Sequence, residues 1–67
     1  MKNYQHWSTE ALNDRKLSLL DDIDQWERFL VNTHSKLIQL SLNHYIKKAK
    51  EEIHAIDAEL CYREHND

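Results

Sequence analysis

The stretch FLVNTHSKLI, residues 29–38, lies at the middle of the chain and decides between two folds. The chain contains no glycine and no proline, so neither of the residues that usually punctuate a helical sequence marks a boundary here. The stretch is therefore either the corner between two helices or the midpoint of one long helix. The spacing of the apolar residues on its two sides distinguishes these alternatives.

Apolar residues recur every three or four positions on both sides of this stretch, as they do along one side of an α-helix. The first stripe consists of Leu12, Leu19, Ile23, Trp26 and Leu30, with the polar Lys16 in line with them. The second stripe consists of Ile38, Leu42, Tyr45, Ile46, Ala49, Ile53, Ile56 and Leu60. Each stripe predicts an amphipathic helix.

The two stripes do not share one register. A continuous helix would extend the first stripe along a mostly polar line, whereas the apolar residues resume at Ile38. The residues from Val31 to Ser35 have modest helix propensity and include good N-caps. We therefore predict an all-α antiparallel hairpin, with helices at about residues 8–31 and 35–63 and a turn at about 32–34. The alternative is a coiled-coil rod that absorbs a one-residue skip.

Residues at the ends of the predicted helices agree with this division. Ser8 is placed to act as the N-cap of the first helix, and Glu10 puts a negative charge in its first turn. Trp7 and Leu12 occupy the two positions of a hydrophobic staple. Arg63 lies near the end of the second helix, where a positive charge complements the helix dipole.

Charge placement also favours the hairpin. Folding the chain back at its middle brings Asp21, Asp22 and Asp24 alongside Lys47 and Lys48, so that opposite charges meet. In a parallel dimer of straight rods, the acidic cluster would instead face its own copy. The expected register therefore predicts ion pairs between the two helices.

A chain of 67 residues is near the size at which one core barely offsets the conformational entropy of folding. Its one cysteine allows no internal disulfide. We therefore expect the hairpin to dimerise into an antiparallel four-helix bundle. The predicted partner-binding residues lie at and beyond the edges of the stripes, and they are Trp26, Phe29, Leu37, Leu40, His44 and Tyr45. Alternatively, Leu37 and Leu40 only close the end of the core.

The sequence carries no catalytic or nucleotide-binding signature, and no cofactor is expected. Cys61 has no candidate base near it except His65, so we do not expect an enzyme. A small acidic helical chain of this kind is expected to act as an adaptor, an inhibitor or a chaperone-like regulator that binds a larger protein through a helix face.

A second hypothesis is nucleic-acid binding through the basic cluster of Lys47, Lys48 and Lys50. In size and layout the chain resembles the small plasmid-encoded RNA-binding four-helix bundles of the Rop kind, which are two-helix hairpins that dimerise. That resemblance implies a dimeric nucleic-acid-binding regulator. The net charge of −3 and the six acidic residues of the first helix, against three basic ones, disfavour RNA binding.

A third hypothesis is a metal- or pH-sensing switch. His54, Asp57, Cys61 and His65 share one strip of the second helix, and the last two have a spacing that can chelate zinc. The strip is too long for all four side chains to reach one ion, so no resident metal is expected. Lys16 either fixes the helix register by pairing with Glu52 or Asp57, or extends its ammonium into water.

The N-terminal residues lack the apolar region of a signal peptide, and the longest run of consecutive apolar residues is three, from Phe29 to Val31. We therefore expect a soluble protein that does not associate with membranes. The single cysteine suits a reducing setting, so a cytoplasmic location is predicted.

Overall fold

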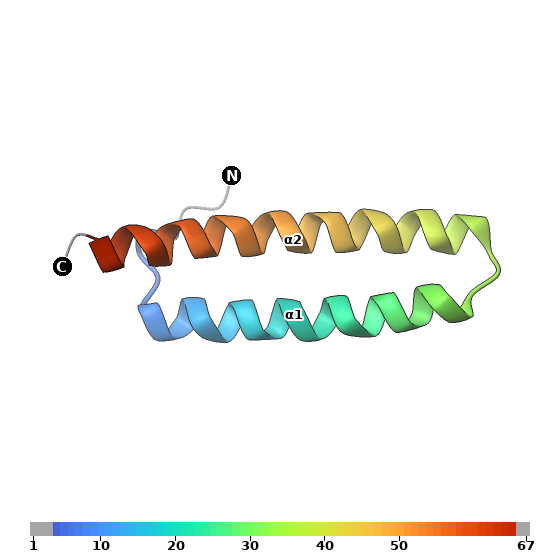
Figure 1. The fold of residues 1–67 in the computed structure, drawn as a ribbon, viewed down its shortest axis with the longest axis horizontal. Coiled ribbons are helices and arrows are strands. Elements are labelled where there is room, and N and C mark those ends of the chain that lie inside the picture. Colours follow the sequence, from blue (N-terminus) through green and yellow to red (C-terminus); the bar gives the residue numbers. More distant parts are fainter. Residues whose placement is uncertain (1–3, 66–67) are drawn as a thin grey trace.

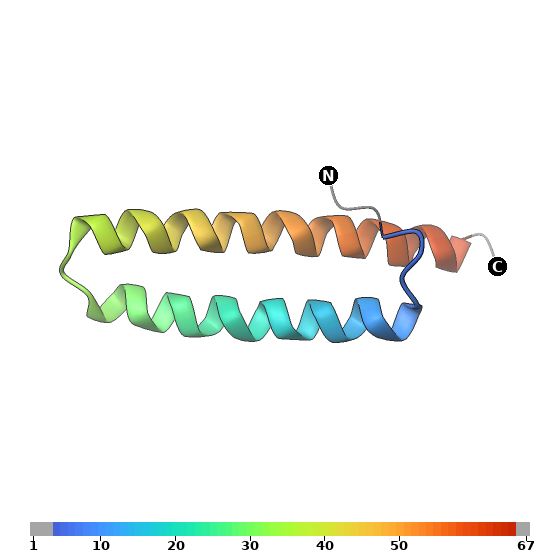
Figure 2. The same ribbon diagram turned by 180° about the vertical axis from the view of Figure 1, so that it is seen from behind.

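The computed structural model describes residues 4–65, which form two α-helices joined by a short corner. Helix α1 spans Thr9–Asn32 and helix α2 spans Lys36–His65. The helices lie side by side and run in opposite directions, so the molecule is an elongated hairpin measuring 49 × 20 × 16 Å (Figures 1 and 2). The predicted hairpin is confirmed, and the alternative of a continuous rod is wrong.

Helix α1 begins as the sequence predicts. The Ser8 side chain accepts a hydrogen bond from the backbone N–H of Ala11 at 3.0 Å, and the Ser8 carbonyl accepts one from Leu12 at 3.0 Å. Glu10 lies in the first turn, near the positive end of the helix dipole. Ser8 is therefore the N-cap that satisfies the first exposed backbone donors of α1.

The corner forms without glycine because it needs no left-handed residue. Thr33 follows α1 in an extended conformation, at φ −95° and ψ 143°, and no described residue has a positive φ. Ser35 then begins α2: its side chain accepts from Ile38 N–H at 3.4 Å, and its carbonyl accepts from Gln39 N–H at 3.0 Å. The Gln39 side chain also donates to the Thr33 carbonyl at 3.2 Å. Polar side chains therefore stabilise the corner at which α1 ends and α2 begins.

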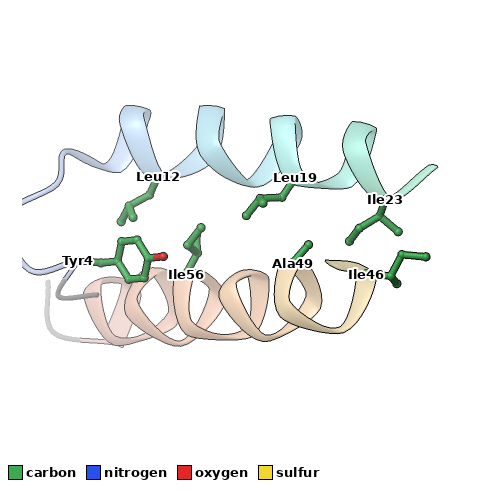
Figure 3. Close-up of a cluster of buried hydrophobic side chains, with 7 residues drawn as sticks. All are labelled: Tyr4, Leu12, Leu19, Ile23, Ile46, Ala49 and Ile56. Atoms are coloured by element: carbon green, nitrogen blue, oxygen red, sulfur yellow. The ribbon is translucent and has the colours of Figure 1, made fainter. Parts of the chain in front are cut away.

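The core is one row of side chains between the two helices. Figure 3 shows its buried cluster, which consists of Tyr4, Leu12, Leu19, Ile23, Ile46, Ala49 and Ile56. Leu12 and Ile56 are fully buried, and Leu42 is also buried. Partly buried side chains pack against the cluster, and they are Trp7, Trp26, Leu30, Ile53 and Leu60. Both predicted stripes therefore supply the core.

Two members of the second stripe depart from the prediction. Ile38 and Tyr45 are 41% and 53% exposed. They lie seven residues apart on one edge of the stripe, and α1 covers only the centre of the stripe because a hairpin gives α2 a single neighbouring helix. The apolar side of α2 is therefore wider than the surface that α1 buries.

The segment before α1 folds over the open end of the hairpin, opposite the corner, and the sequence did not predict this. Tyr4 is 5% exposed and lies beside Leu12 and Ile56 (Figure 3). The backbone N–H of Trp7 donates to the Tyr4 carbonyl at 3.1 Å, and the two rings meet edge to face with centroids 5.2 Å apart. This turn closes the open end of the core.

Arg63 fastens the segment to α2. Its guanidinium donates to the carbonyls of Tyr4 and Trp7, at 3.1 and 2.6 Å, and to the Thr9 hydroxyl at 3.0 Å. Its Nε donates to the Glu59 carboxylate one turn earlier, also at 3.0 Å. Arg63 therefore holds the two ends of the described chain together, in addition to complementing the helix dipole.

A matched pair of substitutions tests the assigned core. Leu12→Ala should lower the free energy of unfolding by about 2–5 kcal/mol, because it leaves a cavity in fully buried packing. Leu17→Ala removes a side chain that is 65% exposed on the same helix, and it should change the free energy by less than about 0.5 kcal/mol. Urea unfolding followed by circular dichroism measures both values. Equal losses would contradict the assigned core.

Candidate functional site

The large apolar side chains that remain exposed gather in the half of the hairpin next to the corner. The described residues include nine of them, and six lie between residues 29 and 45. These six are Phe29, Val31, Leu37, Ile38, Leu40 and Tyr45. The open end, in contrast, is covered by the segment that Arg63 holds. The apolar surface available to another molecule therefore lies mainly at the corner.

One side of this half carries residues from both helices. The rings of Trp26 and Tyr45 pack across the seam with centroids 5.9 Å apart. Phe29 follows Trp26 by three residues and Ile38 precedes Tyr45 by seven, so each lies on the same side of its helix as the ring it neighbours. We call Trp26, Phe29, Ile38 and Tyr45 the corner patch.

The other predicted partner-binding residues lie on a different side of α2. Leu37, Leu40 and His44 are spaced by three and four residues, and they face away from the α2 residues that α1 buries. Leu37 is 78% exposed and Leu40 is 67% exposed, so the alternative that they close the end of the core is wrong. The His44 ring lies 6.1 Å from that of Tyr45, so this set adjoins the corner patch.

Two ion pairs border the core in the open half of the hairpin, one from each side of the seam. Arg15 binds Glu52 through two nitrogens, at 2.8 and 3.3 Å. Lys16 binds Asp57 at 2.6 Å. Of the two expectations for Lys16, the structure therefore shows the pairing with Asp57. Both contacts link α1 to α2 and fix their register.

The expected pairing of the acidic run with the lysines does not occur. Among the described residues, Asp24 pairs with Arg28 of its own helix at 3.1 Å, and no ion pair joins Asp21 or Asp22 to α2. Residues 21 to 24 are spread around most of one helical turn, so a shared level along the hairpin does not place them on the side that faces α2. The predicted position of these residues along the hairpin axis was right, whereas the prediction that they face α2 was wrong.

The three lysines of the nucleic-acid hypothesis do not form one surface. Lys47, Lys48 and Lys50 are all exposed. At about 100° per residue, Lys48 and Lys50 point in nearly opposite directions around α2. A phosphate backbone on either side of α2 would therefore meet only part of the cluster.

The candidate metal ligands lie along one strip of α2, as predicted, without converging. Within residues 4–65, no group of three His, Cys, Asp or Glu side chains is placed to hold a metal ion. Asp57 is bound to Lys16, while His54, Cys61 and His65 are exposed. Cys61 is a free thiol.

At the open end, the pKa of the Tyr4 side chain is strongly shifted. Burial, and to a smaller extent the neighbouring Glu52 carboxylate, raise the pKa of Tyr4 from 10.0 to about 12. The Tyr4 hydroxyl is buried without a partner at strict hydrogen-bonding geometry among the described residues, and the nearby Glu52 carboxylate favours its protonated form first as a hydrogen-bond acceptor and then through its charge. The same carboxylate raises the pKa of Arg15, which it binds. These three groups lie together in the half of the hairpin opposite the corner patch.

Comparisons with known proteins give no relative from which a function can be transferred. No protein-family model matches the chain, and no curated protein or solved structure matches it significantly. Over the described residues, neither α1 nor α2 combines the length and apolar character needed to cross a membrane. The exposed surfaces are therefore the basis for a functional proposal.

The raised pKa of Tyr4 makes stability depend on alkaline pH. The folded protein holds the Tyr4 proton more tightly than the unfolded chain, so this stabilisation is complete below pH 10 and is lost as the pH rises from 10 to about 12. Over this range, the wild-type free energy of unfolding should fall by roughly 2 kcal/mol more than that of Tyr4→Phe.

Urea unfolding at several pH values, followed by circular dichroism, measures this difference. Tyr62→Phe is the control, because it removes the hydroxyl group of a tyrosine that is 65% exposed. The free energy of unfolding of this variant should depend on pH as it does in the wild type. Parallel pH profiles for wild type and Tyr4→Phe would show that the Tyr4 proton is not linked to folding.

Proposed function

We propose that this chain is a non-enzymatic interaction protein, an adaptor, inhibitor or chaperone-like regulator, that binds a larger protein through the corner half of the hairpin. The observation that carries the proposal is the concentration of exposed large apolar side chains between residues 29 and 45. Exposed apolar side chains gathered in one part of a molecule are typical of sites of protein contact. The proposal places the protein in the cytoplasm, where the exposed Cys61 thiol stays reduced.

The corner patch has the composition of a binding hot spot. Trp26, Phe29 and Tyr45 are aromatic, and aromatic side chains dominate the energetics of protein interfaces. Trp26 packs against the hydrophobic core, so the core holds this member of the patch in place. An amphipathic helix of the partner would lie across the seam between α1 and α2 and bury its apolar side on these rings.

The charges around the patch favour a protein with a basic rim over a nucleic acid. Helix α1 carries six acidic and three basic residues. All three of the basic ones form ion pairs, whereas Asp24 is the acidic residue of α1 that does so in the described chain. The outer surface of α1 is therefore acidic, and it repels a phosphate backbone.

We further propose that the chain associates with itself and brings four helices together, as expected for a domain of this size. Support comes from the narrow core, which leaves large apolar residues of α2, Leu37 and Tyr62 among them, exposed on the side away from α1. The sequence predicted an antiparallel four-helix bundle. The ion pairs Arg15–Glu52 and Lys16–Asp57 border both sides of the seam in the open half, and they favour an arrangement in which the second copy docks outside the seam.

A capture experiment with matched variants tests the binding of a larger protein. Immobilised wild type should retain a partner from an extract of the source cells, and Phe29→Ser/Tyr45→Ser should retain at least about tenfold less, because it removes two aromatic anchors. Leu17→Ser/Leu20→Ser is the control, since it removes two exposed apolar side chains outside the patch. Equal retention by both variants, or no specific partner on the wild type, would overturn the proposal.

A further inference from the structure

The side of α2 that faces away from α1 carries a regular stripe of exposed residues. Its members alternate in spacing between four and three residues, which is the spacing of a coiled-coil seam. We call it the outer stripe, and it consists of Leu37, Ser41, His44, Lys48, Glu51, Ala55, Ala58 and Tyr62, all of them exposed. At 1.5 Å per residue it extends over about 37 Å. The outer stripe therefore runs along most of the length of α2.

We propose that a second copy of this chain docks on the outer stripe, with the two α2 helices antiparallel. The inference rests on the proposed self-association and names the face that mediates it. A twofold axis between Lys48 and Glu51 would place each residue of the stripe opposite another member of the same stripe. Leu37 then meets the partner's Tyr62 at each end of the seam.

Charge complementarity selects this alignment. Lys48 lies opposite the partner's Glu51, and the twofold axis repeats the pair. Within the described part of the chain, neither Lys48 nor Glu51 forms an ion pair, so both are available. A parallel alignment would place Lys48 against Lys48 and Glu51 against Glu51, which is repulsive. The stripe is therefore complementary to itself in the antiparallel direction.

The sizes of the other side chains agree with the same alignment. His44 lies opposite the partner's Ala55, and Ser41 lies opposite the partner's Ala58. A large residue facing a small one, and two small residues facing each other, allow the helices to approach closely. Apolar Leu37 and Tyr62, 78% and 65% exposed, then close both ends of the seam.

The arrangement leaves the corner patch uncovered, although His44 of the outer stripe adjoins Tyr45 of the patch. The second copy would cover the side of α2 that faces away from α1, whereas the corner patch includes Trp26 and Phe29 of α1. The four helices would form a row with the two α2 helices at its centre, in place of a bundle with one shared core. A dimer built in this way can bind a larger protein at each corner patch.

Charge reversal tests the proposal through sedimentation equilibrium. Wild type should be a dimer, and Lys48→Glu or Glu51→Lys should each raise the dimer dissociation constant at least about tenfold, because each creates two like-charge pairs at the centre of the seam. The double variant Lys48→Glu/Glu51→Lys should restore the dimer, since it only exchanges the partners. Lys50→Glu makes the same charge change on α2 outside the stripe, and it should leave the dimer intact.

The outcomes separate this inference from the proposed function. A wild-type dimer that both single reversals leave intact, or that the double variant fails to restore, overturns the outer-stripe seam and leaves self-association standing. A monomeric wild type overturns both. Phe29→Ser/Tyr45→Ser should remain dimeric while losing the larger partner, and circular dichroism of every variant should show the wild-type helix content because the substituted side chains are exposed.

Discussion

In the part of the chain that the structure describes, each helix has a single helical neighbour, and this constraint determines what the protein can bury. Two cylinders touch along one line, so the core is a single row of side chains with Leu12 and Ile56 at its most enclosed point. The apolar stripe of α2 is wider than that line. Ile38 and Tyr45 therefore remain at the surface, and the limit on what each helix can bury accounts for the exposed apolar surface near the corner.

The two ends of the hairpin differ in how much of the apolar surface is covered. At the open end, Tyr4 fills the space beside the last core residues, and Arg63 ties its carbonyl to α2. At the corner, Ser35 and Gln39 satisfy backbone groups through their polar side chains, yet no segment within residues 4–65 covers the apolar residues beside them. The core is therefore covered at the open end, whereas exposed apolar side chains gather at the corner.

Most of the fold could be predicted from the sequence, because it depends on local patterns: the change of apolar register, the Ser8 cap and the central members of both stripes. The burial of Tyr4 could not, since it depends on a contact with Arg63 across 59 residues. The corner patch could be predicted only in part. Apolar spacing shows that a helix has an apolar side, but it does not show how much of that side a neighbour covers.

The bonds of Arg63 to the backbone carbonyls of Tyr4 and Trp7 have a consequence for proteolysis. The final turn of a helix normally frays and is trimmed with little effect on the rest of a protein. Here, trimming α2 back past Arg63 would also release the segment before α1 and open the core beside Leu12. Cleavage in the last turn of α2 would therefore also disturb the segment that precedes α1.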